Sequence, residues 1–285
     1  MKNINYIVII FLLIQFACGT KKSIVINENE IVNEKMIKSI KELAIFKPSE
    51  IIMQAIKSNR DSVVEEKFQR YRIYSKNKKV LEFIEKNHKG DLEKSINTLD
   101  KNGRLIGGKK YNSNGDIIET WKYSYDDNGN TAEINYYDID GTLSRKMVNA
   151  HDDENNWLGY KNYNSKGEVT EHHANIYFEN GNLKEKSRYK PDGSLIDRKT
   201  NEYDDNGNVI FSKAYKSDGS FMIYKSEYDD MNNKVENYWI NEKGEQTRQY
   251  SYSYVYDQYG NYITKKRSKD GVLNSMWVRK IEYYD

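Results

Sequence analysis

The chain has 285 residues, of which 37% are hydrophobic, and its 45 Lys and Arg residues against 43 Asp and Glu residues leave a formal net charge of +2. The length allows one large domain or two small ones, and the low apolar content argues against a deep conventional core. Because charges of both signs are interleaved, we expect neither a nucleic-acid partner nor a polybasic membrane patch.

Residues 1–17 are predicted to be a signal peptide. Lys2 precedes an apolar run from Ile7 to Phe16, which is far shorter than the roughly 20 residues that span a bilayer. Cys18, the only cysteine, follows Ala17. This arrangement resembles a bacterial lipoprotein signal, which implies lipidation of Cys18 and attachment to the outer or cytoplasmic membrane of the cell envelope. The alternative is ordinary cleavage near this point, which would give a secreted protein.

Residues 18–32 are predicted to be a tether and residues 33–61 a short helical cap. Two sets of apolar residues have helical spacing, one before and one after Pro48: Met36, Ile37, Ile40, Leu43 and Ala44, then Ile51, Ile52, Ala55 and Ile56. Such a cap would cover the first strand of a sheet. The alternative is a helix pair that docks a partner or a second copy of the chain.

From about residue 62 to residue 285, turn-forming residues recur with gaps that alternate between 12 and 14. The series is Gly103, Gly115, Gly129, Gly141, Asn155, Gly167, Gly181, Gly193, Gly207, Gly219 and Asn233. A fixed period of 26 residues indicates a repeat array. Asp, Asn and Gly favour tight turns, and seven to ten strand-like residues separate consecutive turns.

We therefore predict a mainly β fold: an extended, twisted antiparallel β-meander of 26-residue, two-strand repeats. The chain has 25 tyrosines, and most repeats carry one four residues before the turn. Since strand side chains alternate between faces and both gaps are even, the pattern predicts that all of these tyrosines share one face of the sheet.

The turn sequences resemble known repeats. Residues 125–130 (YDDNGN), 203–208 (YDDNGN) and 256–261 (YDQYGN) resemble YD repeats of Rhs-type proteins, and residues 178–184 (FENGNLK) resemble bacterial MORN-variant repeats. Both resemblances imply β-hairpins. The Rhs resemblance implies a shell around a toxin, for which this chain is too short. The MORN-variant resemblance implies an immunity or antitoxin role.

No catalytic motif is present, and we predict that the protein is not an enzyme and has no cofactor or metal. The sequence contains no Gly-x-Ser-x-Gly, phosphate-binding loop or His-Glu-x-x-His pattern. Adjacent His172 and His173 are expected to point to opposite faces of a strand, so they cannot share a metal. The aspartates of the turns are explained by turn formation, and no carboxylate of the array differs from its equivalents in neighbouring repeats as one of a glycan-hydrolysing pair would.

Four tryptophans are the candidate anchors of a ligand-binding face: Trp121, Trp157, Trp239 and Trp277. An aromatic face with interleaved charges suits an extended glycan or peptide, and the alternative is a hydrated face stabilised by charge pairs. The sequence therefore predicts a non-enzymatic, envelope-anchored interaction scaffold. The alternatives are an immunity-type inhibitor that docks a toxin through the sheet, and a glycan-binding or glycan-active surface protein.

Overall fold

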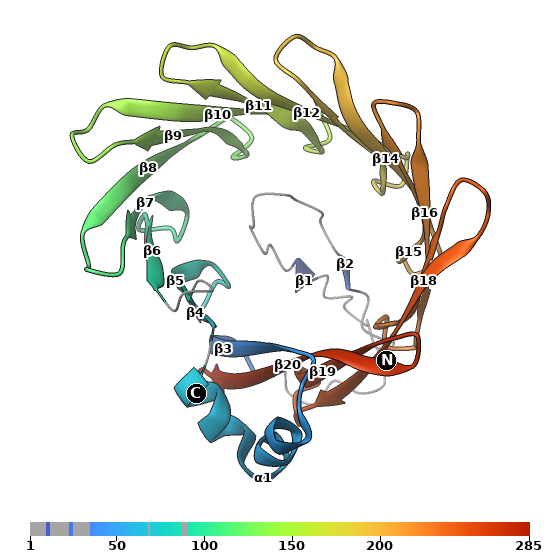
Figure 1. Cartoon of the computed structure of the whole chain (residues 1–285). Coiled ribbons are helices and arrows are strands. Elements are labelled where there is room, and N and C mark those ends of the chain that lie inside the picture. Colours follow the sequence, from blue (N-terminus) through green and yellow to red (C-terminus); the bar gives the residue numbers. More distant parts are fainter. Residues whose placement is uncertain (1–9, 12–22, 25–34, 68, 87–90) are drawn as a thin grey trace, which may run out of the picture.

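The computed structural model describes residues 10–11, 23–24, 35–67, 69–86 and 91–285. Cys18 and nearly all of the predicted signal peptide and tether lie outside these residues. The described part contains one helix and many strands, which form a wide ring (Figure 1). Among the described residues, no helix combines the length and the apolar character needed to cross a bilayer.

Strands β1 (Ile10–Phe11) and β2 (Ser23–Ile24) pair with each other, and α1 spans Glu50–Lys67. The ring contains 18 strands. Their bounds are β3 (Ile37–Phe46), β4 (Arg70–Tyr74), β5 (Val80–Lys86), β6 (Leu92–Leu99), β7 (Leu105–Tyr111), β8 (Ile117–Tyr125), β9 (Thr131–Tyr137), β10 (Leu143–His151), β11 (Trp157–Asn164), β12 (Val169–Tyr177), β13 (Leu183–Tyr189), β14 (Leu195–Tyr203), β15 (Val209–Lys216), β16 (Phe221–Tyr228), β17 (Lys234–Ile240), β18 (Gln246–Tyr256), β19 (Tyr262–Lys269) and β20 (Val272–Tyr283).

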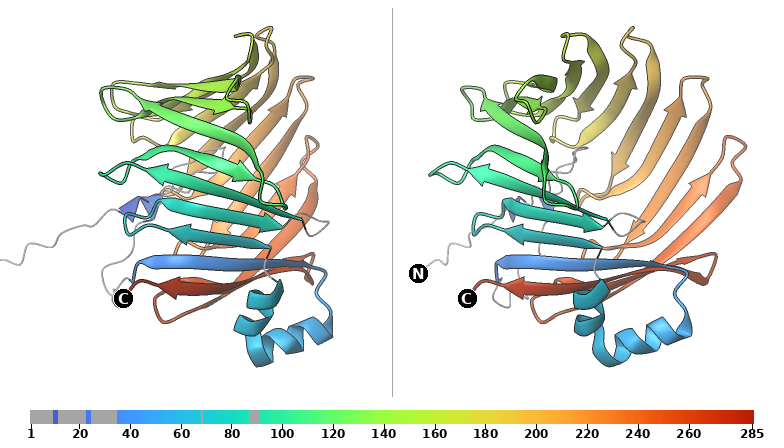
Figure 2. Two further views of the ribbon diagram at one scale, coloured as in Figure 1. Left: turned by 90° about the vertical axis from the view of Figure 1, so that its left-hand side faces the viewer. Right: turned by 60° about the vertical axis from the view of Figure 1, so that its left-hand side comes forward.

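Each strand of the ring pairs antiparallel with the next strand in the chain, and β20 pairs with β3 to close a barrel. The closing register runs from Ser275 opposite Phe46 to Tyr283 opposite Ile37. Figure 2 shows the hairpin turns gathered along two rims. The predicted mainly β, antiparallel meander of short repeats is therefore confirmed, and its two ends meet.

The first helix of the predicted cap, inferred from the spacing of Met36 to Ala44, is wrong, because residues 37–46 form β3 between β20 and β4. Leu43 is buried beneath α1, while its neighbour Glu42 is buried on the opposite face beside Arg279. A strand buried on both faces loses the two-residue alternation, and its apolar residues can then mimic helical spacing. The predicted start of the array, residue 62, falls inside α1, and the sheet resumes at Arg70.

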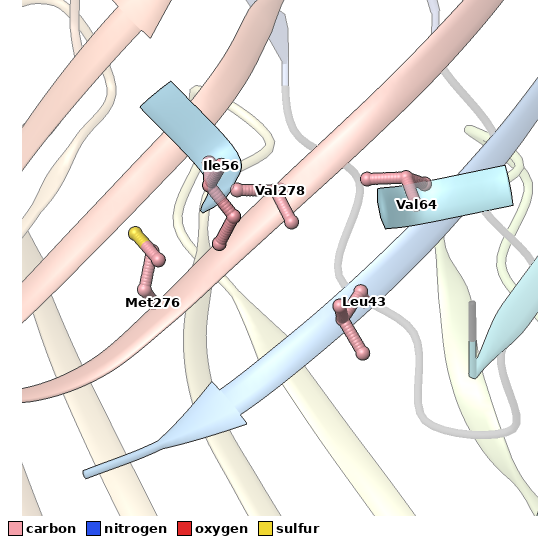
Figure 3. Close-up of a cluster of buried hydrophobic side chains, with 5 residues drawn as sticks. All are labelled: Leu43, Ile56, Val64, Met276 and Val278. Atoms are coloured by element: carbon pink, nitrogen blue, oxygen red, sulfur yellow. The ribbon is translucent and has the colours of Figure 1, made fainter. Parts of the chain in front are cut away.

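Helix α1 packs across the seam at which the ring closes. The buried cluster joins Leu43 of β3, Ile56 and Val64 of α1, and Met276 and Val278 of β20 (Figure 3). Because α1 lies outside the ring in Figure 1, we call the face that carries Leu43, Met276 and Val278 the outer face and the other the inner face. This cluster is the main hydrophobic core of the described chain.

The turns have the backbone that the repeat predicts. At Gly129, the amide donates to the carbonyl of Asp126 at 3.0 Å, and the Asp126 amide donates to the carbonyl of Asn130 at 2.9 Å. Asn155 takes a positive φ of 64°, as predicted. The prediction for Asn233 is wrong, because Asn232 has the positive φ of 59°. Strand β16 has eight residues where β14 has nine, so this turn comes one residue early.

Substitution of Gly193 tests the turn geometry alone. Its φ is +84°, and a Cβ atom there would meet nothing within 4 Å. Gly193→Val is therefore expected to lower the free energy of unfolding by about 1–3 kcal/mol, solely because a β-branched residue is strained at positive φ. Chemical denaturation measures this, and an unchanged midpoint would contradict the turn assignment.

Acid is expected to weaken the turns. Hydrogen bonds from Thr142, Ser194 and Ser220 hold the pKa values of Asp140, Asp192 and Asp218 below their usual 3.8. A depressed folded pKa gives stability that is present above the unfolded value and lost as pH falls through the folded value. We expect melting temperatures to fall between about pH 4 and pH 2. The triple variant with Asn at these three positions should show a flatter pH profile, and an equally steep profile would contradict this.

The prediction that all tyrosine rows share one face is wrong. Tyr125 stacks on Tyr123, and the neighbouring Trp121 pairs with Tyr136, whereas Tyr137 pairs with Thr120 and lies under the Lys122 ammonium at 5.5 Å. The rows before alternate turns therefore lie on opposite faces. Most hairpins contain a register shift near one end, and each such β-bulge inserts one residue and reverses the alternation.

Candidate functional site: the inner face of the ring

The structure places all four predicted tryptophans on the inner face. Trp121 lies opposite Gly108 and Tyr136, Trp239 opposite Tyr224 and Arg248, and Trp277 opposite Lys265. The Trp157 indole N–H donates to Asn149 Oδ1 at 2.9 Å, and its ring stacks on Tyr160 at 5.8 Å. Only Trp239 and Trp277 belong to one continuous set of contacts. Their role in binding stays a prediction.

One row of inner tyrosines is structural. Each hydroxyl donates to a backbone carbonyl 19 or 20 residues earlier, at the start of the preceding strand of the ring: Tyr125 to Leu105, Tyr177 to Trp157, Tyr203 to Leu183, Tyr228 to Val209 and Tyr254 to Lys234. Asn175 and Asn201 donate to two of the same carbonyls, at 2.9 and 3.1 Å. These bonds tie alternate hairpins together along one rim.

The inner face of β3–β14 balances its charges with ion pairs between strands. Four of its cations lie beside carboxylates: Arg70 by Glu85 at 2.8 Å, Lys110 by Glu93 at 2.8 Å, Arg145 by Glu119 at 2.7 Å, and Arg188 by Asp197. Glu42, which is 5% exposed, lies 2.7 Å from Arg279 across the seam. These cations are therefore neutralised within the protein, whereas Lys186 and Lys199 face each other at the edge of this side, on β13 and β14.

The inner face of β15–β20 is different. The strand register places no Asp or Glu on the inner face of these six strands, which are described throughout. The same face carries seven cations: Lys216, Lys234, Arg248, Lys265, Arg267, Lys269 and Arg279. This side of the inner face therefore has a positive charge that carboxylates of its own strands do not balance.

Aromatic rings and cations form a continuous strip across this side, which we call the inner band. It consists of Lys199, Tyr224, Trp239, Arg248, Tyr250, Tyr252, Tyr254, Lys265, Arg267 and Trp277. Lys199 and Arg248 are exposed, and its other members are half-buried. The band runs from β14 to β20 and so crosses seven consecutive strands.

Ring and cation contacts hold the band together. Tyr224 meets Trp239 edge to face at 5.2 Å, and Trp239 lies 6.1 Å from Tyr250. The Arg248 guanidinium lies 4.5 Å from the centre of the Trp239 ring. Lys265 lies within 5.7 Å of the ring centres of Trp277 and two tyrosines. Cation–π contacts of this kind orient the cations and leave them charged.

Arg267 and Lys199 show how the band is fixed and how it is charged. Arg267 lies 5.0 Å from the Tyr250 ring, and its Nη2 donates to Asn274 Oδ1 and Ser275 Oγ, both at 2.9 Å. Its guanidinium is thus held in one orientation. At the other end, burial and then the nearby Lys186 ammonium lower the pKa of Lys199. An anion placed beside Lys199 would favour its charged form and so raise its pKa again.

A cavity of about 450 Å³ adjoins the band at the seam. Trp277 forms one wall, and the other lining residues are Glu42, Ala44, Phe46, Gln69, Arg70, Glu85, Lys86 and Glu93. Its carboxylates Glu42, Glu85 and Glu93 are engaged by Arg279, Arg70 and Lys110. The cavity therefore extends the aromatic band and has no carboxylate set apart for acid–base chemistry.

The histidines lie as the alternation predicts. His172 pairs with outer Lys161, and its ring lies 5.2 Å from Tyr189, whereas His173 is buried on the inner face and stacks on Tyr160 at 4.3 Å. Burial tends to raise the pKa of Glu171, but the neighbouring His173 imidazole and the Asn162 amide lower this pKa below its usual value. Within the described ranges, no three His, Cys, Asp or Glu residues gather in a geometry that could hold a metal ion.

Comparison with known proteins gives structural similarity only. No family model matches the sequence, and no curated protein does. A crystal structure of TcdB2-TccC3-Cdc42 is 15% identical over 82% of this chain, with a TM-score of 0.39. Porin-like proteins from Bacteroides uniformis and Bacteroides vulgatus are each 10% identical, over 86% and 87% of this chain and 98% and 99% of their own, with TM-scores of 0.45 and 0.37.

The chain spans only 13% of the length of the first of these structures. All three matches are consistent with a β-rich fold. Identities and TM-scores this low say nothing about the activity of this chain. The YD-repeat and MORN-variant resemblances therefore stay predictions.

Sequence reasoning missed the cations of the inner band. The signal was present in residues 248–254, where Arg248, Tyr250, Tyr252 and Tyr254 alternate, and in residues 265–267. Both stretches also contain polar residues on the other face, so the pattern by itself did not show which set turns inward.

Proposed function

We propose that this chain is a non-enzymatic binding protein of the bacterial cell envelope that holds an extended ligand against its inner band. The continuity of that band across seven strands is the observation that carries the proposal. Aromatic rings offer flat apolar contacts, and fixed cations beside them add directional polar contacts. A binding role is also supported by the inner carboxylates Glu42, Glu85, Glu93 and Glu119, each of which forms an ion pair with an Arg or Lys side chain.

We further propose that the hairpins are of the YD-repeat type. The structure gives both residues of that dipeptide a task in the fold: the Tyr125 hydroxyl reaches back to the carbonyl of Leu105, and the Asp126 carboxylate accepts from the amide of Asn130 at 2.8 Å. Tyr203 and Asp204 repeat both contacts with Leu183 and Asn208. A motif that closes each hairpin and ties it to an earlier one supports the resemblance.

Attachment to the envelope is proposed to be through a lipid on Cys18. Charged pairs line the outer face, including Lys94 with Glu82 at 2.9 Å and Lys146 with Glu133 at 3.8 Å, which favours a hydrated outer surface. Cells fed a labelled fatty acid should label the wild-type protein and leave Cys18→Ser unlabelled. Equal labelling of the two would contradict this part of the proposal.

Binding is tested with the full chain on a panel of immobilised extended oligosaccharides and peptides. The double variant Trp239→Ala, Trp277→Ala should lose at least about tenfold in affinity for whatever the wild type retains, because such anchors each contribute about 1–3 kcal/mol. Tyr238→Ala is the matched control, since Tyr238 follows Asn237 on the same strand and lies on the outer face. The proposed function would be contradicted if the tryptophan double variant and Tyr238→Ala lost equal affinity, or if the wild-type protein retained none of the probes.

A further inference from the structure

The charges of the inner face separate it into two halves. The inference drawn from this separation concerns the ligand of the inner band and rests on the proposed function. On β3–β14, Arg70, Lys110 and Arg145 pair with carboxylates at 2.7–2.8 Å. On β15–β20, the inner positions carry cations and no carboxylate. A concentration of one sign beside aromatic rings attracts a ligand of the other sign.

The cations also have a regular spacing. Lys265, Arg267 and Lys269 occupy alternate positions of β19 on the inner face. Residues two apart in a strand are separated by about 6.6–6.8 Å, so β19 presents a short ladder of positive charge. Arg248 continues it on β18 beside Trp239. A linear polymer with an anionic group on successive units matches such a ladder better than a single small anion does.

The rings favour sugars over nucleobases. Neighbouring rings meet at steep angles, 74° between Tyr224 and Trp239 and 59° between Trp239 and Tyr250. Nucleic-acid platforms stack successive bases on open ring faces, whereas here guanidinium and ammonium groups lie over the rings of Trp239, Tyr250 and Tyr252. Tilted rings flanked by fixed cations suit a pyranose that carries a carboxylate or sulfate.

We propose that the ligand of the inner band is an acidic polysaccharide, and that Lys265 and Arg267 recognise its anionic groups. The Asn274 and Ser275 contacts use the Nη2 hydrogens of Arg267 and fix its guanidinium, so that Nη1 can donate to a carboxylate or sulfate. The sugar rings contact Trp239, Tyr250 and Trp277 between the cations. The charged groups supply selectivity, and the aromatic rings supply contact area.

The test measures binding of the full chain to alginate, a linear polymer of uronic acids, with dextran as the neutral polymer and an oligothymidylate as the nucleic-acid probe. Alginate should bind best, and its affinity should fall with added salt. The double variant Lys265→Gln, Arg267→Gln should lose about tenfold or more in affinity for alginate, because it removes charge-assisted hydrogen bonds to the anionic groups of the polymer.

The matched control is Lys225→Gln, Lys266→Gln, which removes the same charge from outer positions of β16 and β19. Its affinity should stay within about twofold, since screening weakens charges on the far side of the sheet. Equal losses in the two double variants, or tighter binding of oligothymidylate, would overturn the proposal. Dextran bound as tightly as alginate, with loss in the tryptophan variant, would overturn the acidic ligand and leave the proposed function standing.

Discussion

Val64→Asp is expected to release α1 from the ring and to lower the free energy of unfolding by about 4–5 kcal/mol, the range of an unpaired charge in a core. Val64 is 0% exposed and packs with Leu43, Met276 and Val278 across the seam between β3 and β20. The cluster around Val64 consists of apolar side chains, so an aspartate there would have no described cation within it to pair with and would have to move into water. Loss of α1 would expose the outer face of both closing strands.

The matched control is Ile51→Asp on the same helix. Ile51 is 79% exposed, so the same change of chemistry is expected to alter stability by no more than about 0.5 kcal/mol. Chemical denaturation compares the two variants. Hydrogen exchange then locates the effect, because amides of β3 and β20 should exchange faster in Val64→Asp while those of β10 and β11 stay protected. Uniform acceleration around the ring would contradict a local role for α1.

Gly159→Ala is expected to destabilise the ring by about 3–5 kcal/mol, which is large for the addition of one methyl group. Gly159 has a φ of 128°, and an added Cβ would lie 2.1 Å from the carbonyl oxygen of His173 on the neighbouring strand. The obstacle is backbone, so no side chain can rotate away. Strands β11 and β12 would have to move apart where Gly159 pairs with Ala174.

Gly193→Ala separates the two causes of this effect. Both glycines have positive φ, but a Cβ at Gly193 meets nothing within 4 Å. Its substitution should cost about 1 kcal/mol from backbone strain alone. The difference between the two variants, measured by denaturation, is the contribution of the strand contact. Similar losses in both variants would show that β11 and β12 are not as close as described.

The 26-residue period predicted the hairpins well because a turn is a local structure. Gly103, Gly129 and Gly181 have φ values of 77–81°, and the Asp and Asn residues beside them satisfy the turn within four or five residues of chain. The same locality explains why Asn155 could be assigned to a turn correctly. It also explains the error at Asn233, since the shorter β16 moved the turn by one residue.

The assignment of faces failed where it depended on neighbours across the sheet. Tyr125 and Tyr137 are separated by an even number of residues, yet they lie on opposite faces because the hairpin between β8 and β9 contains a register shift. For the same reason, only part of the candidate site was predicted. The tryptophans were identified as anchors, but the alignment of Arg248, Lys265 and Arg267 beside them required the pairing of three strands.

The amino-acid sequence by itself determined nearly all of the turns, the approximate strand lengths and the antiparallel order of the meander, because these depend on residues close together in the chain. Only the tertiary structure decided that residues 37–46 form a strand, that β3 closes on β20, and that one half of the inner face is left positive. Those outcomes follow from pairing between residues as far apart as Ile37 and Tyr283, and burial on both faces at the seam overrides the local preference for a helix.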